Sequence, residues 1–187
     1  MTASNICTVT KPDPIDDADP FFIGETALAN AVRRIHECHQ SWPETPIAAG
    51  EALWWCSSLD DCHRARIANA GAYWSHRNAS EAGKTVAGLL YARNLTGHQL
   101  VTVPGFVTVG PPLIEPTLVW DEEQQCWCRV GLEPVELRWL PLSALSRPTK
   151  PERNRRDTYY SKYVGDRRVA EPLEVALDFF SRIVWSI

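Results

Sequence analysis

An arginine, an asparagine and a histidine stand close together near the middle of the chain, in the hexapeptide RNLTGH at residues 93–98. Arg93 supplies a permanent cation that binds phosphate, and His98 supplies an imidazole that titrates near neutral pH. These two groups suffice for metal-free cleavage of RNA. The imidazole moves the proton while the guanidinium stabilises the charge that develops on the phosphoryl oxygens. The pattern therefore predicts Arg93, Asn94 and His98 as candidate catalytic residues.

The spacing of these residues constrains how they act together. On a helix, Asn94 and His98 are four residues apart and share a face, so Asn94 is placed to orient the imidazole or to contact RNA. Arg93 points about 140° away from His98 by the same periodicity. Its side chain must therefore curl back or act across an interface.

The segment LLYARNLTGHQL around the hexapeptide resembles the signature of the HEPN superfamily, in which an Arg and a polar residue are followed by a His. The resemblance implies a helical bundle and a metal-independent endoribonuclease, a hydrolase that uses Arg93 on the phosphate and His98 as acid and base. It also implies a homodimer in which both copies of the motif line one cleft. A toxin or antiviral growth-arrest effector, neutralised by a protein antitoxin, is the biological role it suggests.

A basic segment at 147–168 provides a second candidate contact with RNA. It holds eight Lys or Arg and three Asp or Glu, a net charge of +5, so the rest of the chain carries −9 of the total of −4. Cations mixed with tyrosines suit phosphate contact and base stacking. The predicted nucleic-acid-binding residues are Arg153, Arg155, Arg156, Tyr159, Tyr160, Lys162, Arg167 and Arg168.

Two other interpretations account for the same residues. In the first, a non-catalytic α+β protein binds nucleic acid or a protein partner through the segment 147–168. In the second, the motif is structural: Arg93 caps the C-terminus of a helix and His98 is a turn residue. Cleavage of RNA in EDTA, and its loss in His98→Ala, separates catalysis from both.

Metal and nucleotide sites receive little support from the remaining motifs. A structural zinc site usually has two pairs of ligands, each separated by two to four residues. His36 and His39 form one such pair, but Cys126 and Cys128 are separated by one residue and no second pair follows. The tripeptide at 83–85, GKT, lacks the earlier glycine of a phosphate-binding loop, whose position is occupied by Asn78. We expect no metal and no other cofactor.

Hydrophobic periodicity predicts the elements that hold these residues. Apolar residues at helical spacing indicate helices over 25–38, 47–68 and, after a capping signal at Asn78 or Ser80, up to about 97, with a last helix at 171–185. In the second helix Asp60 is expected to face solvent. Gly71 is its expected break, and Gly97 an expected bend. Alternating residues predict a strand–turn–strand centred on 104–105, a hairpin at 118–130 and a strand at 135–140.

The predicted fold class is α+β, mainly a bundle of about four helices with a small antiparallel β insertion between the third and the C-terminal helix. Residues 1–20 are predicted to be a flexible tail, and 21–187 a single HEPN-like domain that includes the insertion at about 101–145. No stretch is apolar over the 18–20 residues that span a bilayer, and no secretory signal precedes the domain. We therefore expect a cytoplasmic protein without a membrane partner.

Overall fold

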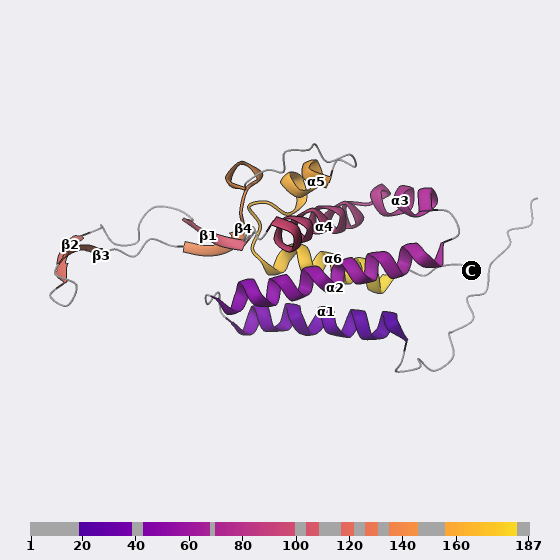
Figure 1. Cartoon of the computed structure of the whole chain (residues 1–187), viewed down its shortest axis with the longest axis horizontal. Helices are drawn as coiled ribbons and strands as arrows, with labels where there is room; N and C mark the ends of the chain where they lie inside the picture. The colour runs from indigo at the N-terminus through magenta and orange to yellow at the C-terminus, as the bar shows by residue number, and fades with distance from the viewer. Residues whose placement is uncertain are drawn as a thin grey trace, which may run out of the picture.

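A computed structural model of the chain describes residues 19–38, 43–67, 70–99, 104–108, 117–121, 126–130, 135–145 and 156–182. Within these residues the chain forms six α-helices, four short strands and one 3₁₀ helix (Figure 1). The α+β class, mainly helical with antiparallel strands between the helices, is confirmed. The expected number of about four helices is wrong, because two shorter helices, described below, flank the four long ones.

Helices α1 (Pro20–Glu37) and α2 (Glu44–Arg66) lie side by side (Figure 1). α1 begins earlier than predicted, because Asp19 and Pro20 form a start signal: the Asp19 carboxylate accepts a hydrogen bond from the backbone N–H of Phe21 at 2.9 Å, and proline fits the first helical position. The predicted tail at 1–20 therefore overlaps the first helix at its end, while residues 1–18 lie outside the described part.

Helix α2 is followed by a separate helix, α3 (Ala70–Ala79), and then by α4 (Glu81–Gln99). The break is not at Gly71 as expected, because α2 ends where Ile67 adopts extended backbone angles. Of the two capping residues in the predicted start signal, Ser80 is the one that acts: its hydroxyl accepts a hydrogen bond from the backbone N–H of Gly83 at 3.0 Å. α4 then continues through Gln99, so Gly97 does not end the helix.

The strands form two separate two-stranded antiparallel sheets in the described part of the chain. β2 (Thr117–Asp121) pairs with β3 (Cys126–Val130), which confirms the predicted hairpin. β1 (Pro104–Thr108) pairs with β4 (Val135–Trp139), with Pro104 opposite Trp139. The predicted turn at 104–105 is therefore wrong: Pro104 opens a continuous strand, a position that proline tolerates, and a Cβ on Gly105 would meet the Leu140 side chain at 2.8 Å.

After the 3₁₀ helix η1 (Leu142–Ala144), the chain forms α5 (Arg156–Tyr163) and α6 (Ala170–Arg182). α5 was missed because it has only eight residues, and Tyr160 is the one buried residue within it. Its buried side consists of Tyr160 with Val164 one turn later, and both lie against Gly88 of α4. α6 corresponds to the predicted C-terminal helix as far as residue 182.

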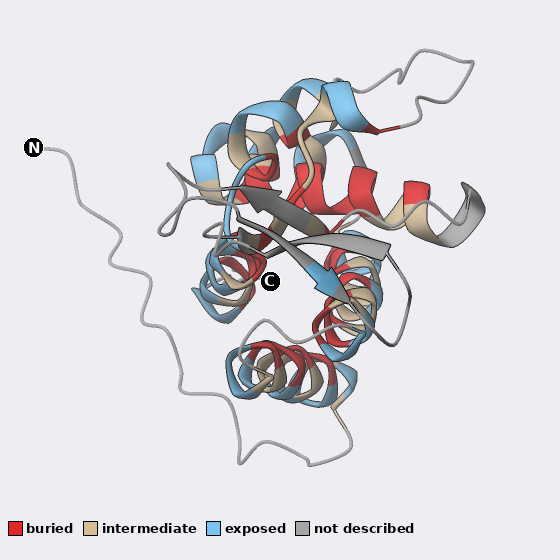
Figure 2. Cartoon of the chain, turned by 90° about the vertical axis from the view of Figure 1, so that its left-hand side faces the viewer, coloured by how far each residue is buried: buried red, intermediate tan, exposed pale blue. Residues whose placement is uncertain are grey.

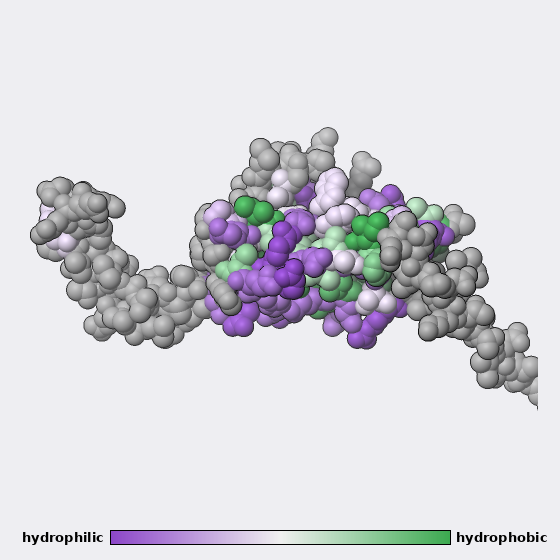
Figure 3. Space-filling model, turned by 90° about the horizontal axis from the view of Figure 1, so that it is seen from below, coloured by the Kyte–Doolittle hydropathy of each residue, from purple (hydrophilic) through white to green (hydrophobic). Residues whose placement is uncertain are grey.

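The hydrophobic core lies between α1, α2, α4 and α6, and Figure 2 shows buried residues on the inward sides of the helices. The predicted apolar faces supply most of it. Its largest members with less than 2 % exposure include Leu28, Leu53, Leu59, Leu89, Leu95, Trp139, Leu173 and Phe180. On the surface shown in Figure 3, a hydrophilic band lies between separate hydrophobic patches toward the two ends of the bundle.

Candidate active site

The candidate catalytic motif lies at the end of α4. Residues 86–92 are buried on all sides, because α2, α3, α5 and α6 all pack against α4. Arg93 and Asn94 are the first consecutive residues after this stretch that reach solvent, and both are half-buried. The motif therefore begins where one side of α4 first reaches solvent, while Leu95 stays in the core.

The side chain of Arg93 lies against α2. Its Cζ atom is 5.3 Å from the centroid of the Trp54 ring, a cation–π distance. Trp54 is nevertheless 57 % exposed, which is unusual for so large an apolar side chain. Sequence reasoning missed Trp54, because its partner is far away along the chain. It could have been suspected only as a tryptophan on the polar side of the predicted second helix.

Position 98 is helical, because α4 continues to Gln99. Asn94 and His98 are therefore one turn apart on the same side of α4, and Arg93 diverges from position 98 by about 140°, as the sequence predicted for a helix. The interpretation of His98 as a turn residue is wrong. The side chain of His98 lies outside the described residues, so its approach to Arg93 stays a prediction.

The side chains in the described part of the basic segment differ in how far they are exposed to solvent. Arg153 and Arg155 lie outside the described residues. Lys162 and Arg167 are exposed, whereas Tyr159 is half-buried and packs near Tyr163, at 6.5 Å between ring centroids. Arg156 is half-buried, and its Cζ lies 5.7 Å from the ring of Trp74 on α3. Lys162 and Arg167 are thus the described cations of this segment most open to a polyanion.

Tyr160 does not belong to a surface that binds nucleic acid. It has no exposed area, and its hydroxyl donates a hydrogen bond to the backbone oxygen of Leu140 at 2.6 Å. Burial raises the pKa of this phenol, with Asp166 and Tyr91 adding to the effect. Its assignment as a base-stacking residue is therefore wrong. A helix of only eight residues is too short for its hydrophobic periodicity to reveal a core position.

Arg168 is exposed but engaged by an acidic neighbour on β4. Its Nη2 and Nε donate to the Glu136 carboxylate at 2.8 and 3.2 Å, and Arg138 donates to the same carboxylate at 2.9 Å. Arg168 contributes most to lowering the pKa of Glu136, and Arg138 acts in the same direction. Arg168 is thus part of an ion network that joins β4 to the turn before α6.

A cleft of about 470 Å³ lies away from the motif, between the end of α1, the start of α2 and the start of α6. His36 lines it, and its Nε2 is 2.7 Å from a carboxylate oxygen of Glu174, which also lines the cleft. Thr45 closes another side with a hydroxyl that has no hydrogen-bond partner among the described residues. The charged residues in the lining of the cleft are Arg168, Glu171 and Glu174.

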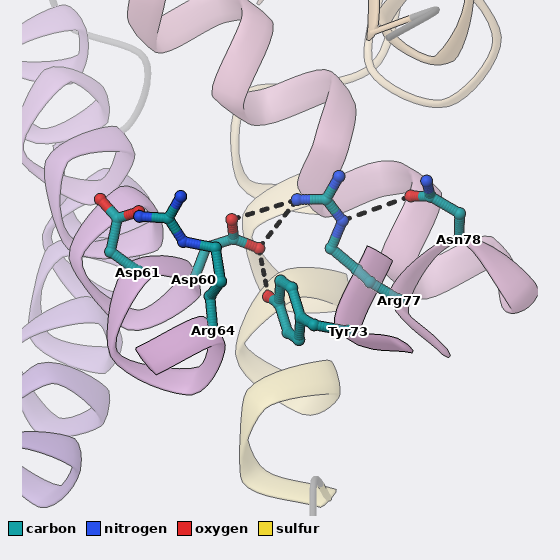
Figure 4. Close-up of polar contacts among 6 residues, drawn as sticks. All are labelled: Asp60, Asp61, Arg64, Tyr73, Arg77 and Asn78. Atoms are coloured by element: carbon teal, nitrogen blue, oxygen red, sulfur yellow. Dashed lines mark hydrogen bonds and ion pairs between the residues drawn. The ribbon is translucent and has the colours of Figure 1, made fainter. Parts of the chain in front are cut away.

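Two buried polar residues on α2 were also missed. Asp60 was expected to face solvent but is 3 % exposed, because Arg77 and Tyr73 of α3 both donate to its carboxylate (Figure 4). His63, one turn further, is enclosed by Phe21 and Phe180 at centroid distances of 4.6 and 5.6 Å. Burial lowers the pKa of His63 to about 4, with the Arg66 charge adding to this effect. Both residues belong to the interior.

The free thiols and imidazoles of the described residues do not converge on a metal site. No group of three or more His, Cys, Asp or Glu with suitable placement occurs in this part of the chain. Cys56 is buried, and burial raises the pKa of its thiol. Among the described helices, none is both long and apolar enough to cross a membrane.

Comparison of the chain with protein-family models, with curated proteins and with solved structures found no match.

Proposed function

We propose that this chain is a metal-independent endoribonuclease of the HEPN type. One observation carries the proposal: Arg93 and the backbone of His98 occupy the last turns of a single helix, on which Arg93 and Asn94 are the first two consecutive residues after the buried stretch 86–92 to reach solvent. Arg93 is held there at the surface beside an exposed aromatic ring. A phosphate-binding cation and a titratable imidazole on one rigid element form the minimal equipment for cleaving RNA.

In this reaction His98 accepts the proton of a ribose 2′-hydroxyl, and the 2′-oxygen attacks the adjacent phosphorus. The bond from phosphorus to the 5′-oxygen breaks, and that oxygen takes a proton from an imidazolium. Arg93 stabilises the negative charge that develops on the phosphoryl oxygens. The products are a 2′,3′-cyclic phosphate and a 5′-hydroxyl, and Asn94 positions the imidazole or the RNA. The reaction consumes no metal and no cofactor.

The divergence of positions 93 and 98 favours a dimer as the active form. Side chains about 140° apart on one helix reach a common phosphate most easily when a second copy supplies one of them. A homodimeric ribonuclease of this type, acting as a cytoplasmic toxin or antiviral growth-arrest effector under the control of a protein antitoxin, is the role we propose.

The test is cleavage of a 5′-labelled single-stranded RNA by the purified full chain in EDTA. We expect cleavage by the wild type and a loss of at least about 100-fold in His98→Ala and Arg93→Ala. Arg33→Ala is the matched control, because Arg33 is an exposed arginine paired with Glu37 on α1. Intact RNA with the wild type, or equal cleavage by His98→Ala, would show that the catalytic assignment is incorrect.

A second candidate function rests on Lys162 and Arg167, which are exposed at the end of α5 and in the turn that follows. These cations favour a non-catalytic protein that binds nucleic acid or an acidic partner through the segment 147–168. In that case Lys162→Glu with Arg167→Glu abolishes binding, whereas His98→Ala leaves binding unchanged and no RNA is cut.

A further inference from the structure

The outer side of α2 exposes two large apolar side chains. Ile47 is 64 % exposed and Trp54 is 57 % exposed, and because seven residues are two helical turns they lie on the same side of α2. Gly50 lies between them, and a Cβ built there would meet nothing within 4 Å, so the space around it is open. The opposite side of α2 is in the core. The surface formed by Ile47, Gly50 and Trp54, which we call the Trp54 surface, is therefore free of cover from the described residues.

Arg93 adds a cation to this surface from a different helix. Its guanidinium carbon lies 5.3 Å from the centroid of the Trp54 ring. The acidic residue nearest along α2 is Glu51, one turn before residue 54, and it is bound by Arg34 of α1. The carboxylate closest in sequence is thus paired with α1, and the Arg93 guanidinium lies beside the ring.

An aromatic ring with an adjacent guanidinium is one arrangement with which proteins bind single-stranded nucleic acid. The ring stacks on an unpaired base, and the cation contacts the phosphate beside it. A base in a duplex is already stacked on both faces, so such a ring selects single strands. Two large apolar side chains are also few for an interface between proteins, which buries about 800 Å² on each partner. The Trp54 surface therefore fits a nucleotide better than a second chain.

We infer that Trp54 is the base-stacking residue of the substrate site, and that the substrate presents an unpaired nucleotide next to the phosphate bound by Arg93. This inference rests on the proposed ribonuclease function, because it places the stacked base beside the candidate catalytic motif. It assigns the substrate class as single-stranded RNA, read at this position by stacking and with little preference for sequence. It also explains why the Trp54 side chain is exposed to solvent.

A measurement of RNA binding tests this inference independently of catalysis. The affinity of the full chain for a fluorescein-labelled, unstructured 12-nucleotide RNA is measured in the His98→Ala background, so that no cleavage intervenes. We expect Trp54→Ala to weaken binding about 5- to 100-fold and Trp54→Phe to retain most of the affinity. Trp120→Ala is the matched control, because Trp120 is 41 % exposed but lies on β2, and its replacement leaves the affinity unchanged.

A double-mutant cycle makes the test specific for stacking. In an RNA whose nucleotides are replaced one at a time by abasic residues, one replacement should weaken binding to the parent protein but have little further effect on Trp54→Ala. Circular dichroism and thermal melting establish that the variants fold as the parent does.

Three outcomes overturn the inference. Equal affinity of the parent protein and the Trp54→Ala variant does so, as does equal binding of duplex and single-stranded RNA. A shift from dimer to monomer in Trp54→Ala, seen by sedimentation, would show that this surface contacts a second copy instead. The outcome for catalysis is independent: if Trp54→Ala weakens binding but the wild type cuts no RNA, stacking is retained and the ribonuclease function is rejected. Absence of RNA binding by the parent protein rejects both.

Discussion

Arg77 of α3 and Asp60 of α2 form an ion pair inside the protein. Nη1 of Arg77 lies 2.9 and 3.1 Å from the two carboxylate oxygens of Asp60, and the two side chains are 2 % and 4 % exposed. The Tyr73 hydroxyl donates to the same carboxylate (Figure 4). The guanidinium also lies 4.5 Å from the ring of Trp74, measured from Cζ. α3 is therefore joined to α2 through a charged contact that is closed to water.

Breaking this pair is expected to destabilise the protein strongly. Asp60→Ala or Arg77→Ala leaves one buried charge without its partner, which costs about 3–5 kcal/mol of unfolding free energy. The double variant Asp60→Leu with Arg77→Met removes both charges and should recover most of that loss. Urea denaturation monitored by circular dichroism measures all three.

The neighbouring pair Arg64–Asp61 supplies the control. It is also drawn in Figure 4, its N–O distance is 2.8 Å, and its side chains are 45 % and 62 % exposed. Arg64→Ala is expected to cost less than about 1 kcal/mol, because exposed ion pairs contribute little. Equal effects of Arg64→Ala and Arg77→Ala would contradict the importance given to burial.

The stability of the protein should fall as the pH drops from about 6.5 to about 4, in part because of His63. The pKa of His63 is lowered to about 4 in the folded protein, whereas a histidine in the unfolded chain has a pKa of about 6.5. Between pH 6.5 and pH 4 the unfolded chain therefore binds a proton that the folded chain does not. The free energy of unfolding then decreases with falling pH, by about 3 kcal/mol from this group, and the effect levels off below pH 4.

The measurement is urea denaturation at pH 7.5 and pH 4.5 for the wild type and for His63→Leu. The difference between the two pH values should be smaller in His63→Leu by about 2–3 kcal/mol. His76→Gln changes an exposed histidine of α3 and should retain the wild-type difference. A pH dependence unchanged in His63→Leu would rule out this residue as its source.

Two glycines are expected to respond in opposite ways to alanine. A Cβ on Gly83 would lie 1.8 Å from the backbone oxygen of Arg77, so α3 and α4 would have to move apart, at a cost of about 3 kcal/mol or more. A Cβ on Gly50 meets nothing within 4 Å, so Gly50→Ala should stabilise the helix by about 0.5–1 kcal/mol. Thermal melting ranks the two variants, and the opposite order would contradict the packing at the start of α4.

We expect replacement of the buried Thr45 hydroxyl to stabilise the protein. It is buried without a hydrogen-bond partner in the described part of the chain, and an unsatisfied buried hydroxyl costs about 1–3 kcal/mol. Thr45→Val keeps the shape and should stabilise the protein by about 1 kcal/mol. Thr85→Val is the control, because the Thr85 hydroxyl donates to the backbone oxygen of Glu81 at 3.0 Å and its loss should bring no gain. A Thr45→Val variant less stable than the wild type would indicate that the hydroxyl is satisfied.

The amphipathic helices and the alternating strands could be predicted because burial imposes a period on the sequence. Leu28, Leu53, Leu89 and Leu173 lie in the core as their spacing predicted. α5 could not be found in this way, because eight residues contain only two turns and Tyr160 is the one buried residue among them. The strand at 104–108 was divided wrongly because Pro-Gly is a turn signal in most contexts, whereas here each residue occupies an allowed place in a strand.

The candidate site was predictable only where its residues are neighbours in the chain. Arg93 and Asn94 precede His98 by a spacing that the sequence displays directly. Trp54 reaches Arg93 only through the packing of α2 against α4. Asp60 was expected to face solvent, because the arginine that allows its burial comes 17 residues later in the sequence. Contacts between elements are determined by the fold, and a periodicity within one element cannot report them.

Two stretches of α4 differ in how they tolerate substitution. From residue 86 to residue 92 every position is enclosed by neighbouring helices, so a substitution there acts on whether the chain folds. At Arg93 and Asn94, which are half-buried, a substitution acts on what the folded chain can touch. Natural variation along this helix should therefore be limited by volume at residues 86–92 and by chemistry at residues 93 and 94. Sequence drift at residues 93 and 94 can alter this part of the surface without disturbing the bundle that carries it.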